Sequence, residues 1–589
     1  MKGENNMEFK TGGITFKSEC KYDLKISAAE QTSEKIKFRI ELDFKQKIVP
    51  ETVVIRWTAP CRNVFSQWNP TLWSERTLNP NWMPIKNISR SAEGMPVQSH
   101  LSLDGKNAVT VSVSDCLTPM KIATGIIEET AEISYKLSLF TERISAIEKY
   151  EAMLLIDTRH IPFEKAVAEA REQWSEYGNG ENPPENTKKP MYSTWYAYHQ
   201  NIEHETIVNE LKLAKELGME TVIMDDGWQT DDSSRGYSHC GDWQSVKIAD
   251  MKKFVDDVHA IGMKYMMWYS VPFVGRFSKA WDKFSNMFLD GYDEKHPWCV
   301  LDPRYPEVRA YIVGIYESAV KNWGLDGLKL DFINNFKLTP ESSAPNEGMD
   351  FESLEEAICA LLSEVKSRLT AIKPDIMLEF RQPYTGPIMC GYGNMLRVAD
   401  CPLDALKNRA GIFDLRLTSG KCAVHSDMLM WNYSDSPESA ALQLINVFFS
   451  VPQISVLIEK LPQSHKNMLK FFLKLWNDNS GCLLDGKLSA KNPEAGYSIA
   501  SAEKGGTMIA ASYVKNCLDI DKQYEKLVFI NGSWDKELCV SSSAPDYSAE
   551  FTVYDCTGNI CDKFKTVVRN GINSFVVPKS GVAVLLKTE

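Results

Sequence analysis

Trp323-Gly-Leu-Asp-Gly-Leu-Lys-Leu-Asp331-Phe-Ile333 is a short apolar segment, bounded by glycine, that carries a carboxylate near its end. Its leucines and aromatic residues predict a strand buried on both faces, as in a parallel sheet inside a barrel. Lys329 and Asp331 are two positions apart, so a strand would point both side chains to the same side. Because unpaired charge inside a sheet is costly, such residues usually lie at the mouth of a strand and have a function there. The alternative is a structural Lys–Asp ion pair.

Similar apolar segments recur through the middle of the chain and alternate with helical patterns. Eight such strands with helices between most of them, spread over roughly 280 residues, are what a (β/α)8 barrel requires. The sequence therefore predicts a central TIM barrel over residues 191–490. The eight predicted strands are 191–198, 221–226, 264–271, 325–333, 376–381, 395–400, 422–431 and 454–461.

The segments on either side of the barrel are rich in short β-strand patterns. Ile36-Lys-Phe-Arg-Ile-Glu-Leu-Asp-Phe44 alternates apolar and polar residues strictly, and such alternation predicts an antiparallel sandwich over residues 1–175. Residues 176–190 are rich in Gly, Pro, Asn and Lys and are typical of a linker. Short strands return from residue 495 to 589 and predict a second, smaller β-sandwich. The predicted fold class is multidomain, α/β plus all-β.

Composition excludes several classes of partner. The 589 residues carry a formal charge of −12, which argues against nucleic acid or an anionic membrane as a partner. The longest apolar segment is too short to span a bilayer, and the first ten residues have no apolar core of a secretory signal. The fourteen cysteines show no framework and no zinc spacing, which suits reduced thiols in a cytoplasmic protein. We expect no metal and no cofactor.

Polar and aromatic side chains follow the predicted strands. In a barrel the loops after the strands form the active face, so these side chains should converge on one rim. Two carboxyl groups flanked by aromatic rings are the apparatus for cleaving a glycosidic bond. The residues at the strand ends are Trp195, His199, Asp225, Asp226, Trp228, Trp268, Lys329, Asp331, Glu379, Arg381, Arg397, Asp400, His425 and Asp427.

The two carboxyl groups need opposite protonation states. Asp331 should stay ionised, because the neighbouring Lys329 favours the charged form. The proton donor must have a raised pKa, and Asp400, which Cys401 and Pro402 follow, is the candidate.

The barrel segment resembles glycoside hydrolase family 36, the α-galactosidases, in the clan that also contains family 27. The matching motifs occur in the same order over residues 191–410. They are Ser193-Thr-Trp195, Asp225-Asp226-Gly-Trp228, Gly241-Asp242-Trp243, Met267-Trp268-Tyr-Ser-Val-Pro272, Leu328-Lys329-Leu-Asp331 and Arg397-Val-Ala-Asp400-Cys-Pro-Leu-Asp404. The sandwich–barrel–sandwich order also fits this family.

The resemblance implies a retaining double displacement on an oligosaccharide or glycoside with terminal α-galactose. Asp331 would be the nucleophile and Asp400 the acid/base. Asp225 and Asp226 would hold the C4 and C6 hydroxyls, with Lys329 assisting. The other residues expected to bind substrate are Trp195, Trp228, Trp268, Arg381, Arg397 and Asp404. Family members are often dimers or tetramers, so a homo-oligomer is expected by resemblance.

Two departures from the family affect the expected specificity. The family's glycine-rich loop after strand five is replaced by Glu379-Phe-Arg381-Gln-Pro-Tyr-Thr-Gly-Pro387, and a family arginine before strand four is absent. Because that loop normally meets the C2 side of the sugar, Arg381 could recognise an acidic or modified sugar. The alternatives are a clan relative acting on an α-N-acetylgalactosaminide, an α-glucoside or an acidic sugar, and a non-catalytic carbohydrate-binding protein.

Several candidate residues also have structural interpretations. Asp225 and Asp226 could cap a helix, and Asp404 could cap the helix expected over residues 405–413. His425 could be a hydrogen-bonded core histidine. Glu379 is expected to pair with Arg381.

Overall fold

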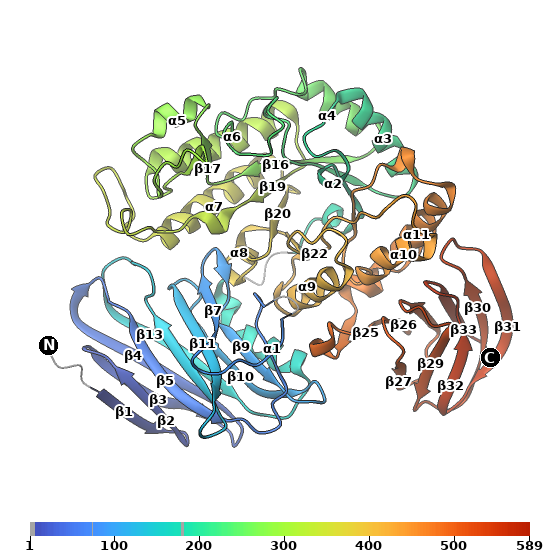
Figure 1. The fold of residues 1–589 in the computed structure, drawn as a ribbon, viewed down its shortest axis with the longest axis horizontal. Helices are drawn as coiled ribbons and strands as arrows, with labels where there is room; N and C mark the ends of the chain where they lie inside the picture. The colour runs from blue at the N-terminus through green and yellow to red at the C-terminus, as the bar shows by residue number, and fades with distance from the viewer. Residues whose placement is uncertain (1–5, 73–74, 178–181, 589) are drawn as a thin grey trace.

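The computed structural model describes residues 6–72, 75–177 and 182–588 and divides into three parts. Figure 1 shows an N-terminal β-sandwich in blue, a central barrel in green and yellow, and a C-terminal β-sandwich in red. The two sandwiches lie on the same side of the barrel. The predicted fold class is therefore confirmed.

The N-terminal sandwich consists of two antiparallel sheets around one apolar core. Alternating burial along β4 shows the pattern that predicted it: Ile36, Phe38, Ile40 and Leu42 face the core, and the residues between them face outward. One sheet contains β1 (Asn6–Thr11), β2 (Ile14–Glu19), β5 (Val53–Pro60), β12 (Glu132–Leu139), β11 (Met120–Ile127), β7 (Ile85–Arg90) and β8 (Glu93–Gly94). The other contains β3 (Asp23–Gln31), β4 (Lys35–Ile48), β13 (Ile147–Asp157), β10 (Asn107–Val113), β9 (Val97–Leu101) and β6 (Ser66–Trp68).

The barrel is an eight-stranded parallel sheet with a strand in or at the edge of each of the eight predicted segments. The bounds of two predictions are wrong: the first strand ends at Ser193 and a helix occupies residues 195–198, and the eighth ends at Ile454, where the predicted strand begins. Parallel bridges such as His425↔Val451 close the sheet between strands seven and eight. In chain order the strands are β14 (Met191–Ser193), β15 (Thr221–Met224), β16 (Lys264–Ser270), β19 (Gly327–Asp331), β20 (Met377–Arg381), β21 (Met395–Arg397), β22 (Ala423–His425) and β23 (Gln453–Ile454). A small hairpin of β17 (Phe273–Gly275) and β18 (Trp298–Val300) follows the third of them.

Helices surround the barrel and cover its strands (Figure 1). Their boundaries follow ordinary capping rules: Asp250, Ser353 and Asp404 each accept a backbone N–H at a helix start. The helices are α1 (Phe163–Arg171), α2 (Trp195–Tyr198), α3 (His204–Glu216), α4 (Met251–Ala260), α5 (Lys279–Phe284), α6 (Pro306–Trp323), α7 (Leu354–Ile372), α8 (Pro387–Tyr392), α9 (Ala405–Thr418), α10 (Pro437–Asn446) and α11 (Gln463–Asp485). Within the predicted linker, residues 178–181 lie outside the described residues, and Glu185–Lys188 form a 3-10 turn.

The C-terminal sandwich has a separate apolar core. One expectation fails here: Cys517 and Cys539 form a disulfide rather than reduced thiols. These two cysteines face each other in parallel register on adjacent strands, a proximity that their separation of 22 residues does not reveal. The strands are β24 (Lys487–Lys491), β25 (Ile499–Lys504), β26 (Thr507–Ser512), β27 (Cys517–Ile520), β28 (Lys526–Asn531), β29 (Glu537–Ser542), β30 (Tyr547–Tyr554), β31 (Ile560–Val568), β32 (Gly571–Val576) and β33 (Val582–Lys587).

The three parts meet at one buried carboxylate, Asp414 of α9. From the N-terminal sandwich side, Trp68 Nε1 donates to it at 2.8 Å and Arg76 Nη2 contacts both of its oxygens at 2.9 Å. From the C-terminal side, Tyr497 Oη donates at 2.7 Å. All four side chains are buried, so this cluster of charge and hydrogen bonds joins all three parts.

The N-terminal sandwich also contacts the face of the barrel that carries the ends of the strands. Arg90 of β7 donates to the carbonyl oxygens of Phe336 at 2.6 Å and Asn334 at 2.7 Å, and it pairs with Glu355. The backbone N–H of Gly94 in β8 donates to Pro383 at 3.1 Å. The β7–β8 hairpin therefore supports the loops that follow β19 and β20.

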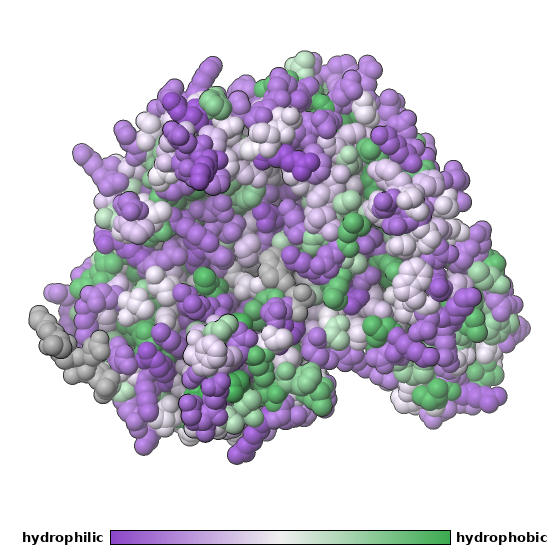
Figure 2. Space-filling view, in the orientation of Figure 1, coloured by the Kyte–Doolittle hydropathy of each residue, from purple (hydrophilic) through white to green (hydrophobic). Residues whose placement is uncertain are grey.

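The surface in Figure 2 is mostly hydrophilic, with scattered apolar residues. Between the two sandwiches lies a groove of about 890 Å³, lined by parts of α1, α9 and the C-terminal strands. In the part of the chain that the structure describes, no helix is long and apolar enough to cross a membrane.

We expect Asp414→Ala to lower the thermal stability of the whole chain. The change leaves the buried Arg76 guanidinium without its carboxylate, and breaking a buried pair from one side costs about 3–5 kcal/mol. Calorimetry should show a lower melting midpoint. Asp478→Ala, on the exposed face of α11, is the control, and an equal midpoint for both variants would contradict the role of Asp414.

Candidate active site

The interior of the barrel changes from apolar at one end to charged at the other. Met191, Ile223, Met266, Met377 and Met395 form a separate apolar cluster inside the sheet. Side chains two positions further along a strand point to the same side, so these residues are followed by Ser193, Asp225, Trp268, Glu379 and Arg397. The methionines therefore fill one end of the barrel, and the polar residues lie above them toward the ends of the strands.

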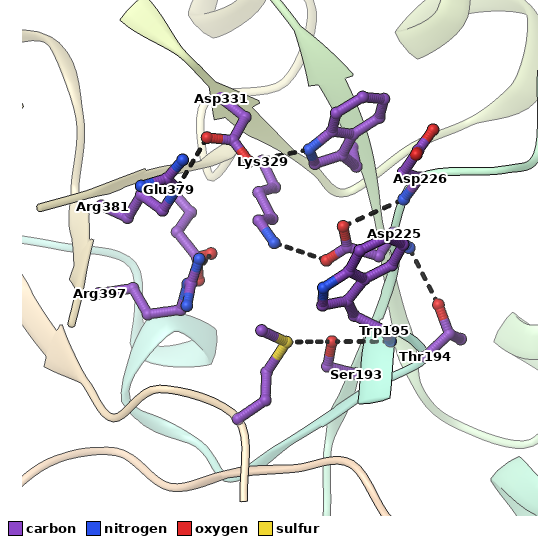
Figure 3. Close-up of polar contacts among 12 residues, drawn as sticks. Ser193, Thr194, Trp195, Asp225, Asp226, Lys329, Asp331, Glu379, Arg381 and Arg397 are labelled. Atoms are coloured by element: carbon purple, nitrogen blue, oxygen red, sulfur yellow. Dashed lines mark hydrogen bonds and ion pairs between the residues drawn. The ribbon is translucent and has the colours of Figure 1, made fainter. Parts of the chain in front are cut away.

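Lys329 pairs with Asp225 rather than with Asp331. Its amine lies 2.5 Å from Asp225 Oδ2, and both side chains are buried (Figure 3). The other carboxylate oxygen of Asp225, Oδ1, accepts a hydrogen bond from the backbone N–H of Asp226 at 3.0 Å. The Lys329–Asp331 ion pair considered as an alternative is therefore not formed, and the observed pair instead links β19 to the end of β15 across β16.

Asp331 is held by four donors. Its Oδ1 accepts from Arg381 Nε at 2.8 Å, from Tyr384 Oη at 2.6 Å and from the backbone N–H of Phe332 at 2.8 Å. Among the described residues, its Oδ2 accepts a single hydrogen bond, from Trp268 Nε1 at 3.0 Å. Burial alone would raise the pKa of Asp331, but the charges of Arg381 and Lys329 outweigh it and hold the pKa well below its ordinary value. Asp331 is therefore ionised, as the sequence predicts.

Arg381 does not pair with Glu379, and that expectation is wrong. Both side chains point into the barrel, but Arg381 lies further along β20, where it reaches Asp331. Glu379 instead accepts from Gln453 Nε2 at 2.6 Å and lies 3.5 Å from Arg397 Nε. Because the Asp331 carboxylate already neutralises Arg381, the geometry gives no support to recognition of an acidic sugar by this arginine.

Arg397 is a fully buried cation shared by three carboxylates. Its Nη2 donates to Asp400 Oδ1 at 3.0 Å, and its Nη1 donates to Asp427 Oδ1. Glu379 is the third partner. Figure 3 shows Arg397 below Arg381, with Glu379 beside both. Its guanidinium is thus placed to hold side chains together rather than to meet solvent.

Asp400 lies at the edge of the site. Its side chain is 48% exposed, whereas Asp331 and Asp427 are buried. Burial of the carboxyl group acts to raise the pKa of Asp400, but Arg397, Lys329 and Arg381 outweigh it, so the pKa lies below the ordinary value. The expectation of a raised pKa is therefore not met in the free protein. The Asp331 charge acts to raise the pKa of Asp400.

Asp226 lies among neutral donors. Gln229 Nε2 donates to it at 2.6 Å and Gln200 Nε2 donates at 3.0 Å. Burial raises its pKa to about 6. No helix begins after β15 in the described residues up to α4, whose cap is Asp250, so the helix-cap interpretation of Asp225 and Asp226 is wrong.

The three candidate tryptophans occupy different places. Trp195, at the start of α2, is partly exposed and packs against His199. Trp268 is buried and donates to Asp331. Trp228 is fully buried, stacks on Trp243, and donates to the carbonyl oxygen of Trp268 at 3.0 Å. Trp228 therefore lies behind Trp268, not on an exposed wall.

Two further candidates have the structural roles considered as alternatives. Asp404 is exposed and caps α9, where it accepts the backbone N–H of Lys407 at 2.9 Å. His425 is buried, and its Nε2 lies 2.8 Å from the carbonyl oxygen of Thr187. Burial lowers the pKa of His425 to about 3, so the ring is neutral. A substrate contact by Asp404 remains a prediction without a geometric basis.

Sequence patterns did not identify several residues of the site. Tyr384, Tyr196, Gln200 and Gln229 all donate to site carboxylates. Of these, Tyr384 follows strand five by three residues and could have been found from its place in the loop that departs from the family pattern. The glutamines belong to no motif. Among the described residues, no group of three or more His, Cys, Asp or Glu side chains could hold a metal ion.

Residues 182–386 match the family model named Melibiase. Alpha-galactosidase AgaA of Geobacillus stearothermophilus is 29% identical over 126 residues, which are 20% of this chain and 15% of that protein. The bifunctional alpha-galactosidase/sucrose kinase AgaSK of Mediterraneibacter gnavus is 34% identical over 84 residues, which are 13% of this chain and 9% of that protein. The sequence matches thus cover a small part of each relative.

Solved structures match over nearly the whole chain. The family 36 α-galactosidase AgaA of Geobacillus stearothermophilus, in complex with raffinose, superimposes with a TM-score of 0.61 and 13% identity, and the match covers 98% of this chain and 82% of that one. The α-galactosidase of Lactobacillus brevis gives a TM-score of 0.59 at 14% identity, covering 98% of this chain and 86% of that one. The Melibiase match in the barrel and this shared three-part fold make the chain similar to the α-galactosidases of glycoside hydrolase family 36.

Proposed function

We propose that this protein is a retaining glycoside hydrolase that removes terminal α-linked galactose. One observation carries the proposal: a buried Asp331 binds Arg381 and a half-exposed Asp400 binds Arg397, and these two arginines are register partners on the neighbouring strands β20 and β21. A nucleophile and a proton donor of this kind are what retaining cleavage needs.

In the first step Asp331 attacks the anomeric carbon. Its Oδ1 already accepts three hydrogen bonds, which leaves no lone pair free, whereas Oδ2 accepts one. Oδ2 is therefore the attacking oxygen. The new bond joins Oδ2 to the anomeric carbon, the glycosidic bond breaks, and Asp400 gives its proton to the departing oxygen. In the second step a water attacks the same carbon, Asp400 takes the proton, and Asp331 leaves as a carboxylate.

The charge of Asp331 links the two roles of Asp400. While Asp331 is ionised, its charge acts to raise the pKa of Asp400 and favours the proton donor. Once Asp331 is esterified by the sugar, that charge is lost, and Arg397 and Lys329 favour ionised Asp400, the form that accepts a proton. The same residue can thus act as an acid and then as a base.

Asp225 and Asp226 supply acceptors for the sugar hydroxyls. Asp225 is oriented by Lys329, and Asp226 by two glutamine side chains, so their free lone pairs have fixed directions. An axial hydroxyl needs an acceptor in a different direction from an equatorial one, which allows galactose to be distinguished from glucose. The relatives are named α-galactosidases, and raffinose and stachyose are bound in two of the similar structures.

The first test combines substrate choice with loss of the nucleophile. The wild-type protein should hydrolyse p-nitrophenyl α-galactoside faster than the α-glucoside or the α-N-acetylgalactosaminide. Asp331→Ala should remove turnover, because alanine has no carboxylate to form the ester, and added azide should give β-galactosyl azide. Persistent turnover in this variant would show that Asp331 is not the nucleophile, and inactivity of the wild type on every α-glycoside would overturn the proposed function.

A second test separates the acid/base from the nucleophile. Asp400→Ala should reduce hydrolysis of raffinose by about 10²–10⁴-fold, the usual contribution of a general acid, and should affect an activated aryl galactoside less in the first step. Azide should rescue this variant with α-galactosyl azide, since the nucleophile is intact. Analysis of the anomeric configuration by NMR distinguishes the two variants. Formation of the β-azide here would reverse the assignments.

A third test concerns the donors that hold Asp331. Tyr384→Phe removes one hydrogen bond to the ionised carboxylate and should raise the pKa of Asp331. The pKa of Asp331 lies well below its ordinary value, so Asp331 stays ionised at neutral pH in both proteins. The lost hydrogen bond no longer stabilises the carboxylate that departs in the second step, so hydrolysis of the galactosyl ester should slow and the ester should accumulate. Mass spectrometry of protein quenched during turnover of p-nitrophenyl α-galactoside measures the ester. A folded variant with no more ester than the wild type would rule out this role for the Tyr384 hydroxyl.

A further inference from the structure

Asp427, which follows strand β22, is a fully buried carboxylate that the double displacement does not use. Each of its oxygens is engaged. Oδ1 accepts from Arg397 Nη1, and Oδ2 accepts from the backbone N–H of Cys401 at 2.7 Å and from Tyr196 Oη at 3.0 Å. Asn408 of α9 holds its backbone from both sides, at 3.0 and 3.3 Å. Such a side chain has one fixed position.

Two of the three donors to the Asp427 carboxylate lead directly to Asp400. Arg397, which Asp427 binds through one guanidinium nitrogen, binds Asp400 through the other at 3.0 Å. Cys401, whose N–H Asp427 accepts, is the next residue in the chain after Asp400. Asp427 thus fixes the cation that faces Asp400 and the backbone that carries it.

We propose that Asp427 is a positioning residue for the acid/base: it shares Arg397 with Asp400, and by doing so it keeps Asp400 able to carry a proton. This inference rests on the proposed function. Without Asp427, the full charge of Arg397 would act on Asp400, and that carboxylate would hold its proton less well.

The charged and titratable groups around this pair come from several elements. Besides Arg397, the groups that act on Asp400 or Asp427 are Lys329 and Asp331 of β19, Arg381 of β20, Tyr196 of α2 and Cys401. Glu379 of β20 faces Arg397. The charge of Lys407 in α9 acts to lower the pKa of Cys401. The charge of Arg397 acts to lower the pKa of His425, whose ring is neutral. The cations on this list already lower the pKa of Asp400, so a nearby negative charge is what limits that lowering.

Removal of the Asp427 charge has two effects on the pKa of Asp400, and both lower it. Repulsion between the two carboxylates raises the pKa of Asp400, and this repulsion is lost. Arg397 loses a competing partner and therefore stabilises ionised Asp400 more strongly. Both changes lower the pKa of Asp400. Burial raises the pKa of Asp427 to about 6, so at neutral pH it is mostly ionised and has this charge to lose.

The test is the pH dependence of raffinose hydrolysis by Asp427→Asn. Asparagine keeps the size and an acceptor oxygen but loses the charge. The alkaline limb of kcat at saturating raffinose, where Asp400 of the enzyme–substrate complex loses its proton, should move to lower pH by at least about half a unit, which is about threefold in rate at a fixed pH on that limb. The loss should be smaller for p-nitrophenyl α-galactoside, whose leaving group needs less protonation, and it should be recovered as the pH is lowered.

Two further variants keep the outcome decisive. Tyr196→Phe removes a donor to ionised Asp427, so Asp427 stays protonated to higher pH. The alkaline limb should therefore also move to lower pH, by a smaller amount than in Asp427→Asn. Asp478→Asn, the same chemical change on the exposed face of α11, should leave the profile unchanged. If circular dichroism shows that Asp427→Asn is not folded, the pH profile of Tyr196→Phe alone tests the inference.

Failure of this inference differs from failure of the proposed function. If the wild type hydrolyses raffinose and the folded Asp427→Asn variant shows the wild-type alkaline limb, or loses activity equally at every pH and on both substrates, Asp427 does not tune Asp400. If the wild type cleaves no α-galactoside, the proposed function itself is wrong.

Discussion

Three buried cations make the charged mouth of this barrel possible. Lys329, Arg381 and Arg397 point inward from neighbouring strands. They are fewer than the carboxylates around them, so some carboxylates share a cation. A buried carboxylate without a cation or hydrogen-bond donor is strongly destabilised, so each must find a partner. The buried carboxylates are Asp225, Asp226, Asp331, Glu379 and Asp427, and the half-exposed Asp400 lies beside them.

These carboxylates have different partners, and their pKa values are therefore shifted in different directions. Asp331, beside two cations, has a depressed pKa, whereas burial raises the pKa of Glu379 and of Asp226, which has only amide side-chain partners. Pairs of carboxyl groups pushed apart in this way are how one fold provides both an acid and a base. The N-terminal sandwich contributes to this arrangement, since Arg90 and Gly94 support the loops that carry Asp331 and Tyr384.

Strand periodicity allowed the fold and the direction of the site side chains to be predicted from sequence. The alternation in Gly327-Leu-Lys329-Leu-Asp331 places both charges inside the barrel, and the structure agrees. Sequence could not reveal which partner each charge takes, because the stagger of neighbouring strands decides this. Glu379 therefore pairs with Arg397 rather than Arg381. Likewise, the sequence does not reveal whether a tryptophan at a strand end faces the pocket. Trp228 does not, because it lies behind Trp268.

The donors around Asp331 have opposite consequences for the two steps of the proposed reaction. Arg381, Tyr384 and the Phe332 N–H stabilise its charge and so make it a weaker nucleophile. In the second step the same carboxylate is the leaving group, and the donors that weakened its attack now stabilise its departure. Because these donors all contact Oδ1, the attacking Oδ2 keeps free lone pairs while the charge developing on departure is shared with a fixed set of donors. Strong hydrogen bonding of the nucleophile is thus compatible with turnover, since it lowers one barrier as it raises the other.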